Sequence, residues 1–135
     1  VSMMPEGTIP RGPAFFETKL QGRWGAAQLA HDTGATVIPI GLWGTEKVWP
    51  RSSRLPKVLN LTDPPTVRIR VGEPVELKGK SVDADTKRIM KAIMAELPDE
   101  ARKAKTPTAD ELALTYPPGY SSDPRNESGR RPGAD

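Results

Sequence analysis

Three features of this 135-residue sequence predict an α/β fold in which helices flank a mixed sheet. Residues 36–43 are nearly all apolar and rich in β-branched side chains, the pattern of a strand buried on both faces. Residues 66–71 alternate apolar and basic side chains, as a half-exposed strand does. Apolar residues also recur at helical spacing before the first of these strands and after the second. The order of the elements indicates the C-terminal part of such a sheet.

The first third of the chain is predicted to contain a strand end, a loop and a helix. Residues 1–4 are apolar, and Pro5 is expected to stop a strand there because proline cannot donate to a ladder. Several prolines and glycines make residues 8–22 a loop. Alanine and leucine at helical spacing predict a helix over 23–33, and Gly34 supplies the left-handed residue that ends such helices.

The two main strands are separated by a long connection. Pro39 predicts a bulge or a sheet edge within the first strand. The connection over 44–65 contains four prolines and is too long for a plain turn. In the second strand, Val67, Ile69 and Val71 share one face.

An amphipathic helix is predicted over residues 83–97. Asp83 is expected to cap its start, and Pro98 ends it. Its apolar stripe consists of Ile89, Met90, Ile93, Met94 and Leu97. We interpret this stripe as core packing.

The chain becomes polar beyond Pro98, which divides it into residues 1–97 and a tail over 98–135. A capping-box sequence at 108–111 predicts one short helix in the tail. Residues 117–135 contain little apolar surface and are expected to be largely disordered.

Composition excludes several kinds of site. Without cysteine the chain has no disulfide or zinc–thiolate site, and one histidine with scattered carboxylates gives no metal-ligand cluster. Residues 1–60 hold seven Lys/Arg against four Asp/Glu, a net charge of +3, which favours an anionic partner. Tryptophan and phenylalanine among these basic residues suit a lipid headgroup region. We expect no nucleic-acid partner, since no recognition-helix or RNA-binding motif is present.

The loop around Glu6 has the chemistry of a phosphate site. Gly7 lets a ligand approach the backbone, loop amides donate to phosphate oxygens, and the guanidinium of Arg11 grips such oxygens in a bidentate manner. The same residues are also compatible with an ordinary turn that carries a surface arginine.

Four blocks within residues 1–50 resemble the 1-acyl-glycerol-3-phosphate acyltransferase family. Residues 5–8 resemble its F-P-E-G-T-R block, 25–30 its K-x-G-A-x-x-L-A helix, 37–40 its V-I-P-V strand and 44–45 its G-T turn. Residues 43–56 and 115–120 further resemble actinobacterial members of this family. The four blocks occur in the family's order, which makes the resemblance specific.

The resemblance implies an O-acyltransferase of phospholipid biosynthesis, peripheral on the cytoplasmic face of a membrane. Such an enzyme moves a fatty acyl group from an acyl-CoA or acyl carrier protein thioester to an acceptor such as 1-acyl-glycerol-3-phosphate, and no cofactor beyond the thioester is implied. The resemblance assigns acceptor binding to Glu6, Gly7 and Thr8, and it puts Pro39 in the strand beside the acceptor or acyl site.

The sequence departs from the family at the next position, where Ile9 stands in place of an arginine. We expect Arg11, two residues further on, to bind the acceptor phosphate instead. Glu6 is expected to bind acceptor hydroxyls or to anchor the loop.

The family's general base lies in a His-x-x-x-x-Asp motif, which this chain lacks. Its one histidine, His31, is followed at once by Asp32, and Thr36 stands five residues later. Adjacent helix residues point about 100° apart, so Asp32 is poorly placed to orient the imidazole. We therefore expect no catalytic residue here, an inactive chain, and a catalytic half encoded upstream of Val1.

Without that half, the strand at 37–42 should present an uncovered apolar face, and the chain alone should be poorly soluble or partly molten. The alternative function is a non-catalytic module that binds anionic lipid or phosphate.

Overall fold

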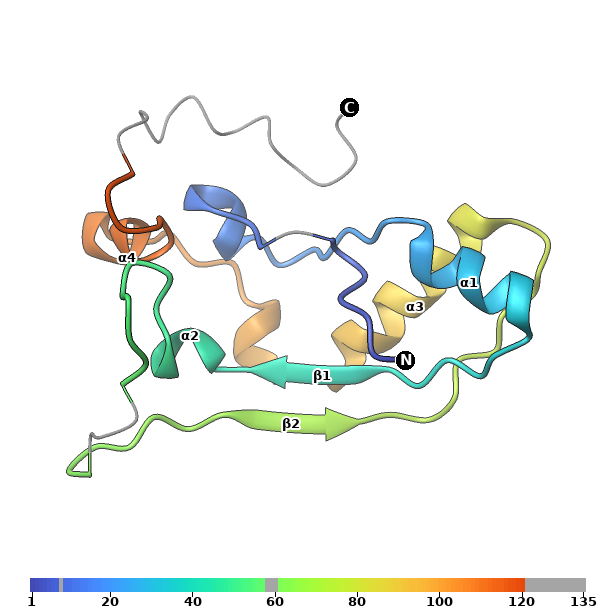
Figure 1. Ribbon diagram of the computed structural model, residues 1–135, viewed down its shortest axis with the longest axis horizontal. Helices are drawn as coiled ribbons and strands as arrows, with labels where there is room; N and C mark the ends of the chain where they lie inside the picture. Colours follow the sequence, from blue (N-terminus) through green and yellow to red (C-terminus); the bar gives the residue numbers. More distant parts are fainter. Residues whose placement is uncertain (8, 58–60, 121–135) are drawn as a thin grey trace.

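The computed structural model describes residues 1–7, 9–57 and 61–120 (Figure 1). Its elements in chain order are η1 (Gly12–Phe16), α1 (Gly25–Thr33), β1 (Ile40–Trp43), α2 (Thr45–Val48), β2 (Arg68–Val71), α3 (Val82–Glu96), η2 (Asp99–Arg102) and α4 (Ala109–Leu114). Within the described residues this is a mixed α/β arrangement of four α-helices and a two-stranded antiparallel sheet.

Proline shortens the first predicted strand. β1 begins only after Pro39, whose carbonyl accepts a hydrogen bond from the amide of Gly72 at 2.9 Å. Val37 forms an isolated bridge with Val75 on the other side of the proline. Pro39 thus interrupts the ladder, as expected from its missing N–H.

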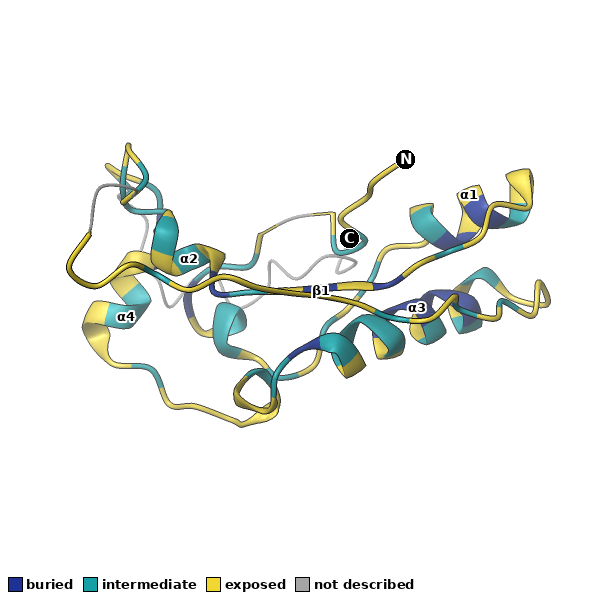
Figure 2. Cartoon of the chain, turned by 90° about the horizontal axis from the view of Figure 1, so that it is seen from below, coloured by how far each residue is buried: buried dark blue, intermediate teal, exposed yellow. Residues whose placement is uncertain are grey.

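Helix α3 covers one face of the sheet, as Figure 2 shows edge-on. A side chain at Gly41 would place its Cβ 2.7 Å from the backbone of Glu96, and one at Gly72 would meet the Glu96 carboxylate at 2.6 Å. The C-terminal end of α3 therefore lies against Gly41 of β1, where only a residue without Cβ fits, and the Glu96 side chain reaches Gly72 just after β2.

The opposite face of the sheet is apolar and exposed. Ile40 pairs with Val71, and Leu42 with Ile69, so these four side chains share one face, which we call the open face. They are between 40% and 65% exposed. The prediction of a strand buried on both faces is therefore wrong, because the described residues supply a helix layer on one side only. The expectation of an uncovered apolar face is confirmed.

The core lies between α1 and α3. Ala27 and Ala30 of α1 are buried against α3, which buries Ile89 and Met90. Both helices occur where the apolar spacing predicts them, and Gly34 ends α1 with φ +67°. The prediction that Asp83 caps α3 is wrong.

The cap of α3 is Ser81, whose Oγ accepts a hydrogen bond from the amide of Ala84. Asp83 lies inside the first turn and pairs with Lys87 instead. Ser81 acts as the cap because its backbone is extended, whereas Asp83 is already helical.

Asp85 is the polar centre of this core and is fully buried. Its Oδ1 accepts hydrogen bonds from the amide of Lys78 (3.1 Å) and from Nη1 of Arg88 (2.6 Å). Its Oδ2 accepts from the amide of Gly79 (2.8 Å) and lies 2.9 Å from Nε2 of His31. Burial by itself would raise the pKa of Asp85, but these hydrogen bonds outweigh it and hold the pKa well below the usual range of a carboxyl. One carboxylate therefore joins α1, the loop before α3, and α3.

One expectation for the chain ends needs correction. Residues 1–4 form no strand, because no described segment lies beside them as a ladder partner; Met4 instead accepts a hydrogen bond from the amide of Gly7 in a turn. Of the segment expected to be largely disordered, residues 117–120 are described, and the rings of Tyr116 and Tyr120 stack with centres 4.7 Å apart. The rest of that predicted tail, 121–135, lies outside the described residues. The capping box predicted at 108–111 is confirmed in α4.

We expect Asp85→Asn to lower the midpoint of thermal loss of helical circular dichroism by about 5–10 °C at pH 7. An asparagine amide presents N–H groups to a site that holds four hydrogen-bond donors. The stability from Asp85 is present above the ordinary carboxyl pKa of about 3.9 and is lost as the pH falls toward the lowered folded value. The midpoint of the wild type should therefore decline below about pH 4 more steeply than that of Asp85→Asn. Asp32→Asn, an exposed change on α1, is the control, and equal midpoints for the two variants would contradict the role of Asp85.

The open face should drive self-association of the chain. We expect the double variant Ile40→Lys/Ile69→Lys to bind about half as much of a hydrophobic dye as the wild type, and to stay monomeric at higher concentration in sedimentation velocity. Leu55→Lys, which changes an apolar residue that is 76% exposed outside the sheet, is the control. If Leu55→Lys has the same effect, the open face is not the cause.

Candidate functional site

The loop of residues 5–11 is a tight turn tied to the start of α1. Gly7 has φ +69°, and its amide donates to the carbonyl of Met4 at 3.0 Å. The amide of Arg23 donates to the carbonyl of Pro5 at 2.7 Å. Thr8, one of the predicted acceptor-binding residues, lies outside the described residues. The turn geometry explains why a glycine occupies position 7.

Two arginines from other segments, Arg23 and Arg51, contact this loop, and we call them together with Arg11 the arginine cluster. The side chain of Arg23 packs on Gly7 so closely that a Cβ there would lie 2.8 Å from its Cδ. Nη1 of Arg51 donates to the carbonyl of Ile9 at 3.1 Å. Arg11 belongs to the loop itself. Sequence reasoning identified Arg11 but missed the other two, which only folding brings to the loop.

Glu6 is half-buried in the same turn. Burial raises the pKa of its carboxyl. Its side chain makes no hydrogen bond or ion pair with any described residue, so within that part of the chain the arginine cluster does not neutralise it. A carboxylate in this position is able to accept a hydrogen bond from a ligand hydroxyl.

Residues 115–120 of the tail pack beside Arg11 and Gly12, at the end of the loop. The amide of buried Gly12 donates to Oγ1 of Thr115 at 2.8 Å, across 103 positions of sequence. A Cβ on Gly12 would lie 2.2 Å from the hydroxyl oxygen of Tyr116. The guanidinium carbon of Arg11 lies 5.8 Å from the ring centre of Tyr120. The two tyrosines in an otherwise polar segment were the available sequence signal for this contact.

Pro39 is not part of this assembly as the structure describes it. It is buried, and its contacts are with Gly72 in the turn after β2. No described contact joins it to residues 5–11. Glu6, Gly7 and Arg11 belong to one loop, whereas the described contacts of Pro39 are with another part of the chain.

His31 has a partner that the sequence did not indicate. Asp32 accepts a hydrogen bond from Gln28, at 2.8 Å, and does not orient His31, as expected. The imidazole instead lies against Asp85, which is 54 positions away in sequence. This pair fastens α1 to α3, which makes its role structural.

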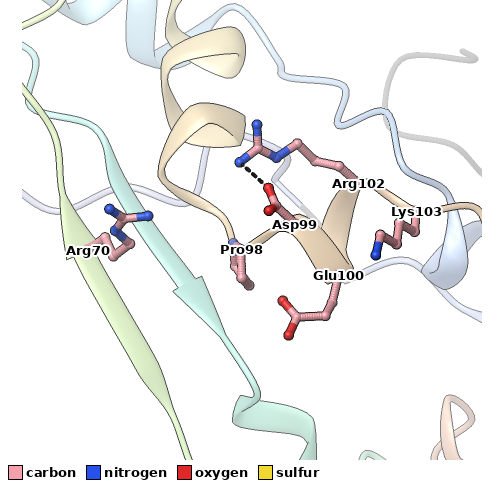
Figure 3. Close-up of a pocket in the computed structure, with 6 residues that line it drawn as sticks. All are labelled: Arg70, Pro98, Asp99, Glu100, Arg102 and Lys103. Carbon is pink, nitrogen blue, oxygen red and sulfur yellow. Dashed lines mark ion pairs between the residues drawn. The ribbon is translucent and has the colours of Figure 1, made fainter.

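A shallow depression of about 460 Å³ lies elsewhere, between β2 and η2 (Figure 3). It is lined by Arg70, Pro98, Asp99, Glu100, Arg102 and Lys103. Arg102 pairs with Asp99 at 3.2 Å, and Glu100 pairs with Arg68 at 3.4 Å. Its lining carries three basic and two acidic side chains, and no predicted site residue lines it.

The loop and the arginine cluster are therefore the candidate site, in which Arg23 and Arg51 contact the backbone of the loop that carries Arg11. In the part of the chain that the structure describes, His, Asp and Glu nowhere gather in groups of three or more that would hold a metal ion. None of the described helices combines the length and the apolar character that crossing a bilayer requires.

Comparisons of the chain with protein-family models, with curated proteins and with solved structures gave no match in any of the three.

Proposed function

We propose that this chain is the acceptor-binding part of an O-acyltransferase that moves a fatty acyl group from a thioester to a lysophospholipid-type acceptor such as 1-acyl-glycerol-3-phosphate. The observation that carries the proposal is the convergence of three arginines from three segments on the Pro5–Arg11 loop. The four sequence blocks that resemble glycerolipid acyltransferases support the same assignment.

The chemistry of this acceptor matches the loop. A phosphate monoester offers three oxygens, and arginine binds such oxygens through paired N–H donors. A backbone turn at a glycine lets those oxygens approach the loop amides. Glu6 then accepts a hydrogen bond from the glycerol hydroxyl, so one loop recognises both the charge and the hydroxyl of the acceptor.

We do not assign the catalytic base to any residue of this chain. Acyl transfer to a hydroxyl requires a group that takes its proton, and the family places that group in a His-x-x-x-x-Asp motif. We propose that this motif is encoded upstream of Val1, and that the complete enzyme works at the cytoplasmic surface of a membrane, where its acceptor resides.

A second function is favoured by one observation. His31 is held by Asp85, so the described residues supply an anion-binding loop without a poised base. A module that binds anionic lipid or phosphate without catalysis would have this composition.

Neutralising the arginine cluster should weaken binding of the phosphate-bearing lipid. We expect Arg11→Gln, Arg23→Gln and Arg51→Gln each to reduce binding of the chain to phosphatidylcholine vesicles containing 1-oleoyl-glycerol-3-phosphate by about tenfold, because each removes a charged donor. Vesicles with 1-monooleoylglycerol, which lacks only the phosphate, should bind weakly to all the variants. Arg54→Gln, an exposed arginine of the same connection as Arg51, is the matched control. Equal losses for Arg54→Gln would indicate a diffuse surface charge and no site.

Transfer itself distinguishes the enzyme from the binding module. We expect the 135-residue chain to transfer no acyl group from oleoyl-CoA to 1-oleoyl-glycerol-3-phosphate, and the product of the extended reading frame to do so. The extension should contain a His-x-x-x-x-Asp motif. An extended protein that binds the phosphate lipid but transfers nothing would favour the non-catalytic module.

A further inference from the structure

We infer that the C-terminal segment 115–120 completes the anion site, and that Tyr120 is a positioning residue which orients the guanidinium of Arg11 for a phosphate monoester. The inference rests on the proposed function of the loop. It adds a part of the site, about 100 residues away in sequence, that the resemblance to acyltransferases does not assign.

The segment is fixed to the loop by contacts at several points. Gly12, next to Arg11, donates its amide to Thr115, and the ring of Tyr116 lies against Gly12 where a side chain would clash. The amide of Ser52 donates to the carbonyl of Leu114 at 3.3 Å, so the segment also adjoins the connection that carries Arg51. Thr115 and Tyr116 are both buried. These contacts hold the end of α4 beside two members of the arginine cluster.

The ring of Tyr120 continues this packed segment and lies over Arg11. Its ring stacks on that of Tyr116, with centres 4.7 Å apart and planes inclined by 23°, which restricts the ring's orientation. The guanidinium carbon of Arg11 lies 5.8 Å from the centre of the Tyr120 ring, within the range of a cation–π contact. Arg11 is in a loop with no regular secondary structure of its own, so the ring supplies the restriction that the backbone does not.

Stacking and anion binding use different parts of a guanidinium. The ring attracts the flat face of the group, whereas its N–H donors point outward within the plane. An arginine whose guanidinium lies over a ring has fewer orientations available while its edge stays open to an oxyanion, so less rotamer freedom is lost when the anion binds. Position 9 is isoleucine, and Arg11 stands two residues further along the chain, so an oriented side chain would help Arg11 to take the place of an arginine that follows Thr8 directly.

The test compares the wild type, Tyr120→Phe, Tyr120→Leu, Arg11→Gln and the double variant Arg11→Gln/Tyr120→Leu in the 135-residue chain. The probe is phosphatidylcholine vesicles with 1-oleoyl-glycerol-3-phosphate. We expect Tyr120→Leu to weaken binding about threefold and Tyr120→Phe to bind as the wild type does, because phenylalanine keeps the ring face. In the Arg11→Gln background, Tyr120→Leu should cause no further loss.

A merely structural role for Tyr120 would give a different pattern. If Tyr120→Leu weakens binding equally with and without Arg11, or leaves it unchanged while Arg11→Gln weakens it, the inference is overturned and the proposed function stands. If the wild type does not distinguish the phosphate lipid from 1-monooleoylglycerol, both the inference about Tyr120 and the proposed function are overturned.

In a second measurement, the decisive result comes from the wild-type chain and needs no variant to fold. The side-chain protons of Arg11 should show an upfield ring-current shift in the wild type, which Tyr120→Phe keeps and Tyr120→Leu loses. Unshifted Arg11 protons in the wild-type chain would overturn the inference without any binding experiment.

Discussion

The buried carboxylate of Asp85 is the interaction on which the described structure depends. It accepts hydrogen bonds from two backbone amides and Arg88, and it holds His31 of α1 against α3. The apolar contact between these helices involves few buried residues, namely Ala27 and Ala30 of α1 and Ile89 and Met90 of α3. Because an unpaired buried carboxylate is costly, the arrangement of the helices is specified by the need to satisfy it.

The packing of α1 on α3 around Asp85 also positions the candidate site. The helix begins just after Arg23, whose amide binds the carbonyl of Pro5 and whose side chain packs on Gly7. The position of the loop therefore follows from the position of α1 on α3. The polar core and the candidate loop are thus connected through α1, although no residue belongs to both.

The features that the sequence predicts well are those encoded locally. Helical periodicity, the glycine that ends α1, the break at Pro39 and the capping box of α4 all depend on residues within a few positions of one another. The burial of the strands was wrongly predicted because an apolar strand does not reveal how many layers cover it. Ser81 was missed as the cap because two acidic residues after it carry the same chemical signal.

The candidate site likewise has one part that the sequence predicts and one part that only folding reveals. Glu6, Gly7 and Arg11 lie within one short segment, so the sequence alone indicates a loop with a carboxylate, a glycine and a guanidinium. Arg51 and Thr115 reach the loop from 42 and 103 positions away, and no periodicity or motif links residues at such separations. The polar composition of the tail gives no sign of these contacts, in which two tyrosine rings and one buried hydroxyl hold residues 115–120 beside Arg11 and Gly12.

The open face and the candidate site have one explanation under the proposed function. Ile40, Leu42, Ile69 and Val71 form an apolar surface that the described residues leave exposed, and the loop lacks a catalytic base. Each feature by itself has a different explanation, since apolar faces also mediate association and anion-binding loops also serve in binding modules. Together they are accounted for by one further layer of protein that covers the sheet and carries the base. That layer would have to place its histidine beside the arginine cluster, which restricts how it is able to pack on the open face.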